Sequence, residues 1–409
     1  MLKFIRRFLK RLSFLKTTSF YHFIQEIFFS NLIRIISKCF SNKVDNNLLI
    51  LSAYGGNAFV DNTKYLYLYL LNNTKYNVLW IAKSKRLYAD MRQSGYPVIR
   101  KFSLFTIKYL RKARFIFLTH GIYDILPIEF SSNTTVVLIW HGVLNKRNNT
   151  EHGPLLFGNL ARFLKLHIVN DLYIDYFVTP SGTKKDKELI IHYFQINPKK
   201  IITTGFPRND ILFTEDNNLL SSLRKKYDIP ESIEKVFLYA PTFRDSKLTA
   251  KLPLSKRELK ELSQFLYNNH SILIMKAHMF EQSIEFKEYS NVKKVNQDVD
   301  IQELLTITNV LLTDYSSVYC DFLLLNRPIL LFTYDYDEFM KKGRGFYYDY
   351  KAIAPGPLLF TGKELLNAIQ NIDLIDKEYE DKRIKTRKIY HKHVDGNSTE
   401  RILKYLKLI

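Results

Sequence analysis

Several short apolar runs in the chain end in residues that could bind or activate a phosphate group. The run TTVVLIW is followed by His141 and a glycine, and the basic residues Lys146 and Arg147 come soon afterwards. A histidine at a strand end can act as a general base because the pKa of imidazole lies near neutrality. The alternative is a histidine that makes only structural hydrogen bonds, and this motif alone leaves both interpretations open.

Two further runs end in donors suited to phosphate oxygens. In YAPTFRD, Thr242 and Arg244 lie just past an apolar run, and the planar guanidinium fork of arginine matches a phosphate group. A surface salt bridge between Arg244 and Asp245 is the alternative. The sequence KAH repeats the theme with Lys276 and His278.

The sequence TDYSS places Ser316 and Ser317 at a predicted strand-to-helix turn, directly after Asp314. Exposed N–H groups at a helix start favour an anion, and the two hydroxyls add donors. An ordinary helix cap is the alternative. Taken together, these motifs predict a site for a pyrophosphate in which cationic and N–H donors replace a divalent metal ion.

Motifs typical of several other chemistries are missing from the sequence. It has no GxxxxGK[ST] loop, no GxGxxG after a strand, no HExxH and no cysteine cluster, which argues against nucleotide hydrolysis, a dinucleotide cofactor and zinc. Asp335 and Asp337 have the spacing of a metal-binding pair, but they follow a proline-containing strand late in the chain. We interpret them as loop or helix-capping residues and expect neither a metal nor a cofactor.

The elements that position these residues are short strands alternating with helices. Apolar runs recur between residues 48 and 181, and again between 235 and 332 after a charged stretch near 217–227. This alternation predicts an α/β fold with parallel sheets covered by helices on both faces. We expect two such domains, at 46–215 and 216–409, that face each other across a cleft. The last helix is expected to pack back across the domains.

The net charge of +21 requires an anionic partner: nucleic acid, a membrane surface or a polyanionic substrate. The first sixteen residues, within an N-terminal segment at 1–45, carry six cations and no acidic residue. On a helix, Phe4, Phe8, Leu12 and Leu15 would share one face, as in helices that lie in an anionic membrane interface. The alternative is a basic helix packed on the domain.

The location expected from the sequence is the cytoplasmic face of the membrane, as a peripheral protein. The most apolar stretch, 23–40, is interrupted by charged and amide residues, whereas a membrane span needs about 20 mostly apolar residues. There is no signal peptide with a small-residue cleavage site. Cys39 and Cys320 lie far apart and fit a reduced protein better than a disulfide framework.

The motifs, in order and spacing, resemble those of the CDP-glycerol glycerophosphotransferases of teichoic acid and capsule synthesis. The resemblance runs from about residue 50 to 357 and is most specific over 311–350. It implies a fold of the glycosyltransferase B type with two Rossmann-like domains. It also implies that an acceptor hydroxyl attacks the distal phosphorus of a CDP-linked donor, without a metal, and releases CMP.

The resemblance also implies roles for individual residues. His141 matches the base of the N-terminal, acceptor-binding domain. The donor pyrophosphate site of the C-terminal domain matches Arg244, His278, Ser316 and Ser317. Five further residues are expected near the donor ribose or in the lining of the cleft: Thr242, Asp314, Asp321, Arg208 and Asn209. Of these, Asp321 is expected near the ribose, and the TGFPRND segment is expected near the hinge. Lys146 and Arg147 are expected on the acceptor side.

There are two departures from the family pattern, and the first, which lies on the acceptor side, concerns the identity of the acceptor more than the donor chemistry. Val143 and Leu144 follow WHG where relatives often have Thr-Pro, and Met279 follows His278 where relatives often have proline.

Enzymes that transfer ribitol phosphate share the same motifs, so a CDP-ribitol donor is an alternative. A nucleotide-sugar glycosyltransferase is a second alternative. A nucleic-acid-binding module is a third, which a basic stripe with aromatics on one surface would favour.

Overall fold

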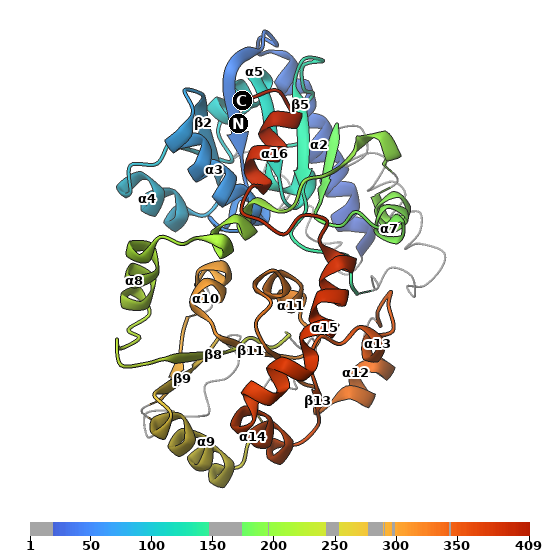
Figure 1. Cartoon of the computed structure of the whole chain (residues 1–409). Helices are drawn as coiled ribbons and strands as arrows, with labels where there is room; N and C mark the ends of the chain where they lie inside the picture. Colours follow the sequence, from blue (N-terminus) through green and yellow to red (C-terminus); the bar gives the residue numbers. More distant parts are fainter. Residues whose placement is uncertain are drawn as a thin grey trace. The chain divides into compact units, whose positions relative to one another are not determined.

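The computed structural model describes residues 19–146, 174–194, 196–242, 253–276, 289, 291–296, 299–342 and 345–409. Its described residues fold into two compact units (Figure 1). Unit 1 holds residues 19–141, 174–178, 191–194 and 196–202, and unit 2 holds 142–146, 179–190 and the described residues from 203 onward. The basic segment at 1–16 lies outside the described residues.

The observed division differs from a boundary at 215/216, because unit 2 begins earlier and takes two segments from the first half of the chain. Lys146 forms an antiparallel bridge with Phe346. The N–H of Lys392 donates to the carbonyl of Pro180 at 2.9 Å. These are pairings between residues roughly 200 positions apart, which apolar periodicity along the sequence does not predict.

Unit 1 is built on a seven-stranded sheet with the strand order β3-β2-β1-β4-β5-β6-β7. Neighbouring strands from β3 to β6 are parallel. The strands form where apolar residues run without interruption: Leu48 to Leu51 at the end of β1 are all buried, as expected for a sheet covered on both faces. The strands are β1 (Asp45–Leu51), β2 (Asn77–Ala82), β3 (Val98–Arg100), β4 (Ala113–Leu118), β5 (Thr135–Ile139), β6 (Tyr176–Thr179) and β7 (Ile201–Thr203).

Two of the helices that connect these strands, α4 and α5, begin at polar caps. The Ser84 and Ser103 side chains accept from backbone N–H groups in the first turns of α4 and α5, which satisfies donors that a helix start leaves unpaired. The second half of α2 packs on unit 1, since Ile33 and Ser37 are fully buried. The helices are α2 (Ser19–Lys38), α3 (Asp61–Asn73), α4 (Lys85–Gln93), α5 (Leu104–Lys112) and α7 (Lys184–Phe194), of which residues 184–190 belong to unit 2.

Membrane-spanning helices are not found among the described residues: none there is both long and apolar enough to cross a bilayer. The residues of α2 from 29 onward belong to the fold of unit 1, so the N-terminal segment expected at 1–45 contains part of this unit. Lys38 at the end of α2 pairs with Glu129 at 3.3 Å. The Ser37 hydroxyl accepts from the Glu129 N–H at 3.3 Å.

Unit 2 is built on a six-stranded, wholly parallel sheet with the order β10-β9-β8-β11-β12-β13. Its strands are β8 (Lys235–Tyr239), β9 (Ser271–Met275), β10 (Val292–Lys294), β11 (Val310–Thr313), β12 (Ile329–Phe332) and β13 (Leu358–Leu359). The helices of this unit are α8 (Asn217–Lys226), α9 (Lys256–Asn268), α10 (Ile301–Ile307), α11 (Val318–Phe322), α12 (Tyr336–Lys342), α13 (Tyr350–Ile353), α14 (Gly362–Gln370), α15 (Ile372–Tyr390) and α16 (Ser398–Tyr405).

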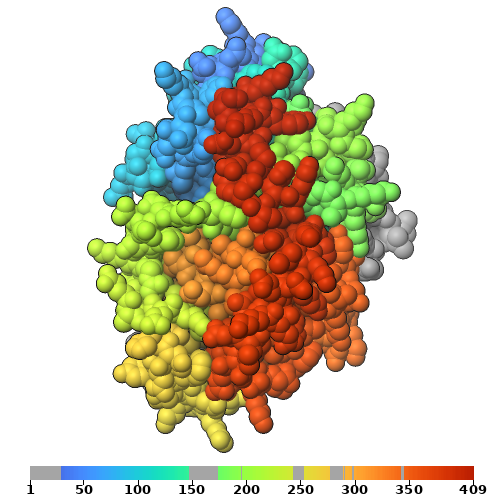
Figure 2. All heavy atoms as spheres, viewed as in Figure 1, coloured from blue at the N-terminus to red at the C-terminus, as the bar shows by residue number. Residues whose placement is uncertain are grey.

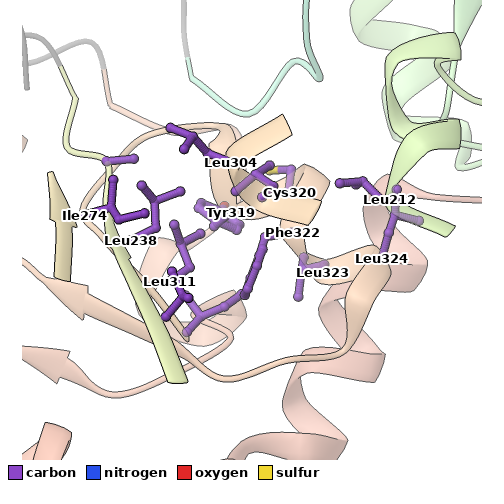
Figure 3. Close-up of a cluster of buried hydrophobic side chains, with 14 of the residues drawn as sticks. Leu212, Leu238, Ile274, Leu304, Leu311, Tyr319, Cys320, Phe322, Leu323 and Leu324 are labelled. Atoms are coloured by element: carbon purple, nitrogen blue, oxygen red, sulfur yellow. The ribbon is translucent and has the colours of Figure 1, made fainter. Parts of the chain in front are cut away.

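Two apolar cores cover the two faces of this sheet, as the period of two along a strand requires. Leu238 and Leu311 face one core, which includes α10 and α11, whereas Tyr239 and Leu312 face the other, with α9 and α14. In the first core, buried side chains from β8, β9, β11, α10 and α11 gather around Tyr319 and Cys320 (Figure 3). Figure 2 shows α15 on the outer surface of unit 2.

The expected α/β class with two parallel, Rossmann-like sheets is confirmed. In both sheets the strand order reverses direction beside the first strand. The reversal lies between β1 and β4 in unit 1 and between β8 and β11 in unit 2. Open parallel sheets bind ligands beyond the carboxyl ends of the strands at this switch point. The fold therefore directs attention to the loops after these four strands.

Candidate active site

Hydrogen bonds join the loops at the switch point of unit 2. Asp314 lies just after β11, and Thr242 lies just after β8. The Asp314 carboxylate accepts from the Thr242 N–H and from the Thr242 hydroxyl, both at 2.7 Å. The same oxygen accepts from the Ser316 N–H at 3.2 Å. The Tyr350 hydroxyl donates to the Asp314 carbonyl at 2.7 Å. Asp314 therefore fixes the two loops against each other.

Lys146 brings a cation to this cluster. Its Nζ lies 3.4 Å from the Thr242 hydroxyl oxygen and 5.7 Å from the centre of the Phe339 ring. The backbone of Lys146 is held by its bridge to Phe346. The sequence placed Lys146 on the acceptor side, and the structure places its ammonium among the strand ends of the unit that carries the donor motifs.

Ser316 and Ser317 lie beside the same cluster, as the motif predicted. Both side chains are half-buried, and the Ser316 hydroxyl accepts from the Val318 N–H at 3.4 Å. Gly142 lies next to Ser317: a Cβ at this glycine would be in ordinary van der Waals contact with the Ser317 hydroxyl oxygen, at 3.9 Å. The helix that follows, α11, is only five residues long. The role of the two hydroxyls as donors to an anion stays a prediction.

Asp321, Arg208 and Asn209 come together in a buried network. Arg208 Nη2 pairs with Asp321 Oδ2 at 2.8 Å, and their side chains are only 11 % and 6 % exposed. Asn209 and Gln302 donate to the two Asp321 oxygens at 3.1 and 2.9 Å. In this structure Asp321 joins α11 to the TGFPRND segment. Its role near a ribose stays a prediction.

His141 in unit 1 follows β5 and lies among aromatic rings. Its ring stacks on that of His120, with centroids 4.2 Å apart and planes 8° apart, and Trp140 lies 4.0 Å away. His141 Nδ1 lies 3.4 Å from the Thr119 carbonyl oxygen. Because a carbonyl can only accept, this contact favours a proton on Nδ1 and leaves Nε2 as the basic nitrogen.

A loop anchored by Asp124 forms the switch point of unit 1. Its carboxylate accepts from the N–H groups of Gly55, Thr119 and His120, each at 2.7 Å. Burial raises the pKa of the Asp124 carboxyl. Lys101, after β3, donates to the carbonyls of Gly55 and Tyr123, and burial lowers the pKa of its ammonium to about 8.

The glycine pair after β1 allows this loop to form. Gly56 has a φ of +82°, and a Cβ there would lie 3.1 Å from the Lys83 nitrogen. A side chain at this position would meet both backbone strain and a clash. The Lys83 N–H donates to the Gly56 carbonyl at 2.6 Å, so the loops after β1 and β2 are joined.

Three predicted site residues lie outside the described residues, and one histidine at the switch point of unit 1 was not predicted as a site residue. Arg147, Arg244 and His278 lie outside the described residues, and their roles stay predictions. His120 was not among the predicted site residues, although THG repeats the His-Gly pattern of WHG after an apolar strand. That repeat could have indicated His120 as a candidate site residue.

The described residues contain no group of three or more His, Cys, Asp or Glu side chains that could hold a metal ion. The Tyr315 hydroxyl donates to Asp335 at 3.0 Å, and Asp337 lies in the first turn of α12. These contacts fit the interpretation of both residues as loop or capping residues. The independence of the chemistry from a metal stays a prediction.

The family described as CDP-Glycerol:Poly(glycerophosphate) glycerophosphotransferase matches the chain over residues 34–408. The chain belongs to this family. The match covers both sheets, the WHG segment and the strand ends around Asp314. The resemblance inferred from the motifs is thereby confirmed.

Proteins similar to this chain differ in length. A teichoic acid poly(glycerol phosphate) polymerase of Bacillus subtilis (strain 168) is 30% identical over 344 residues, which are 81% of this chain and 45% of the polymerase. A teichoic acid glycerol-phosphate transferase of Staphylococcus aureus (strain NCTC 8325 / PS 47) is 29% identical over 377 residues, 89% of this chain and 94% of that protein. The chain thus spans about half of the first relative and nearly all of the second. Ribitol-phosphate polymerases are also similar to it.

A solved structure supports the same fold. The wall teichoic acid polymerase TagF matches with a TM-score of 0.76 at 22% identity, over 95% of this chain and 95% of that chain. At this level of identity the likeness shows the fold alone, which is that of two parallel α/β sheets.

Proposed function

We propose that the protein transfers glycerol phosphate from CDP-glycerol to a hydroxyl of a teichoic-acid-like or capsular acceptor and releases CMP. The observation that supports this most is at the switch point of unit 2: Asp314 holds the loops after β8 and β11 together, and Lys146 and Ser316 lie at this edge of the sheet within one family's motifs. The Lys146 ammonium and the serine hydroxyls are groups that suit a pyrophosphate. A donor screen with CDP-glycerol, CDP-ribitol and UDP-sugars tests the proposal.

The proposed reaction is a single displacement at phosphorus. The acceptor oxygen attacks the distal phosphorus of the donor, the bond from that phosphorus to the bridging oxygen breaks, and CMP leaves with the electron pair. His141 accepts the hydroxyl proton on Nε2, the nitrogen left basic by the contact of Nδ1 with the Thr119 carbonyl. Lys146 and the predicted Arg244 would offset the negative charge on the leaving phosphate.

We expect Lys146→Met to weaken CDP binding about 10- to 100-fold, because a charged hydrogen bond contributes roughly 1.5–3 kcal/mol. CMP binding should change much less, since it lacks the second phosphate. Isothermal titration calorimetry with both nucleotides measures this difference. Lys351→Met is a matched control, because the Lys351 ammonium also lies over an aromatic ring, 4.7 Å from the centre of Tyr336. Unchanged CDP affinity with a raised KM for the acceptor would contradict this expectation and would support a role for Lys146 in binding the acceptor.

The second expectation under this proposal is that the chemistry needs no divalent metal, because cationic and N–H donors take its place. Turnover measured after exhaustive chelation should equal that of the untreated enzyme. Loss of turnover on chelation, with rescue by magnesium or manganese, would contradict this and give Asp335 and Asp337 a role.

The positive charge of the chain supports an anionic acceptor and an anionic membrane surface as partners. Each lysine or arginine near an anionic surface contributes about 1 kcal/mol, and six of them lie within the first sixteen residues. We propose peripheral attachment through that segment, with no role for nucleic acid. CDP-ribitol remains the main alternative donor, since ribitol-phosphate polymerases are also similar to this chain.

A further inference from the structure

The segment from Phe346 to Tyr350 contacts the switch point of unit 2 at both of its ends, and it has no part in the proposed reaction. At its start, Phe346 forms an antiparallel bridge with Lys146, whose ammonium lies 3.4 Å from the Thr242 hydroxyl oxygen. At its end, the Tyr350 hydroxyl donates to the Asp314 carbonyl at 2.7 Å. One short segment therefore contacts both the residue that brings the cation and the residue that joins the two loops.

The packing around Tyr350 holds its hydroxyl in a fixed place. Only 1% of this residue is exposed. Its ring stacks on that of Phe346, with centroids 4.6 Å apart and planes 25° apart, and the Tyr315 ring packs against it at 5.7 Å. Burial raises the pKa of the Tyr350 phenol well above its usual range, so the hydroxyl keeps its proton. The Asp314 carbonyl thus faces a rigid donor.

The carbonyl that accepts this bond belongs to the residue whose carboxylate links the loops after β8 and β11. That carboxylate accepts from the N–H groups of Thr242 and Ser316 at 2.7 and 3.2 Å. Asp314 is only 1% exposed, so its carbonyl would lose a donor in a buried place if the Tyr350 hydroxyl were removed. This loss raises the free energy of the observed arrangement, and other arrangements of the loop after β11 gain population.

We propose that Tyr350 is a positioning residue for the donor: its hydroxyl holds the Asp314 peptide, and thereby the loops after β8 and β11, in the arrangement that binds the donor pyrophosphate. This inference rests on the proposed function, which places the donor at these loops. It predicts an effect on donor binding and not on the chemical step, because a bound donor itself holds the loops in the competent arrangement.

The test compares KM for CDP-glycerol and kcat in the full-length wild type and Tyr350→Phe, which keeps the ring and removes the hydroxyl. We expect KM to rise about three- to tenfold, because the apparent affinity falls with the fraction of protein in the competent arrangement. The value of kcat should stay near that of the wild type.

Tyr390→Phe is the matched control for this variant. Tyr390 is buried in the same apolar core as Tyr350, but its hydroxyl lies 3.2 Å from that of Tyr319 in α11 and not against the Asp314 carbonyl. Both kinetic constants of the control should equal those of the wild type. An equal rise of KM in both variants would overturn the proposal, since the effect would then come from a general loosening of the core.

Amide hydrogen exchange, followed by mass spectrometry without any substrate, separates this inference from the proposed function. Peptides that contain the Thr242 and Ser316 amides should exchange about three- to tenfold faster in Tyr350→Phe and at the wild-type rate in Tyr390→Phe. Equal exchange in the wild type and Tyr350→Phe would overturn the proposal. Faster exchange with an unchanged KM would also overturn it, because Tyr350 would then serve only the fold. If the proposed function fails, the wild type itself does not use CDP-glycerol, and the exchange rates alone decide whether Tyr350 holds the loops.

Discussion

His141→Ala is expected to lower the rate of transfer by roughly a hundred- to ten-thousandfold, the usual contribution of a general base. Donor affinity should remain nearly that of the wild type. The reason is that His141 belongs to unit 1, whereas the predicted donor residues Thr242, Ser316 and Ser317 belong to unit 2. CMP release with acceptor present measures the rate, and calorimetry with CDP-glycerol measures the affinity.

The matched control for this variant is His192→Ala, which removes an exposed histidine from the same unit. Its rate should equal that of the wild type. If a folded His141→Ala protein kept more than about a tenth of wild-type turnover, the assignment of the base would be wrong.

Asp321→Asn is expected to give the largest loss of stability, about 3–5 kcal/mol in the free energy of unfolding. The substitution removes the charge that compensates the buried Arg208 guanidinium at 2.8 Å, and a buried charge without its partner is strongly destabilising. Asparagine also presents a donor group to Asn209 or Gln302, which already donate to this position. Urea denaturation followed by circular dichroism measures the loss.

Two comparisons make the stability result specific. The double variant Arg208→Met with Asp321→Leu should recover much of the loss, because an apolar pair needs no charge compensation. Glu188→Gln breaks an exposed pair with Lys184 at 3.7 Å and should cost no more than about 1 kcal/mol. A loss below about 1 kcal/mol for Asp321→Asn would show that the network contributes little.

The strands and the polar residues at their ends could be predicted from the sequence, because an apolar run and the polar residue that follows it are neighbours in the chain. The order of the strands could not. Thr242 and Asp314 are 72 positions apart, and they meet because β8 and β11 are neighbours at the point where the sheet reverses its order. The sequence could only indicate that both residues follow strands.

The surroundings of two further residues could not be predicted from the local sequence pattern. Lys146 was predicted on the acceptor side because it follows WHG closely, and the pairing of its backbone with Phe346, 200 positions later, could not be predicted from that motif. Asp321 lies in the most specific motif, and its surroundings come from Arg208, Asn209 and Gln302, none of them near it in sequence. Each role depends on long-range pairing.

The measurement that tests the central claim most directly is transfer from CDP-glycerol labelled in its glycerol. The full-length protein is incubated with this donor and a short glycerol-phosphate acceptor, and both products are separated by chromatography. We predict equal amounts of CMP and of an acceptor longer by one labelled phosphoglycerol, with no turnover of UDP-sugars. Release of UDP from a nucleotide sugar, or the absence of transfer from both CDP-glycerol and CDP-ribitol by folded protein, would contradict it.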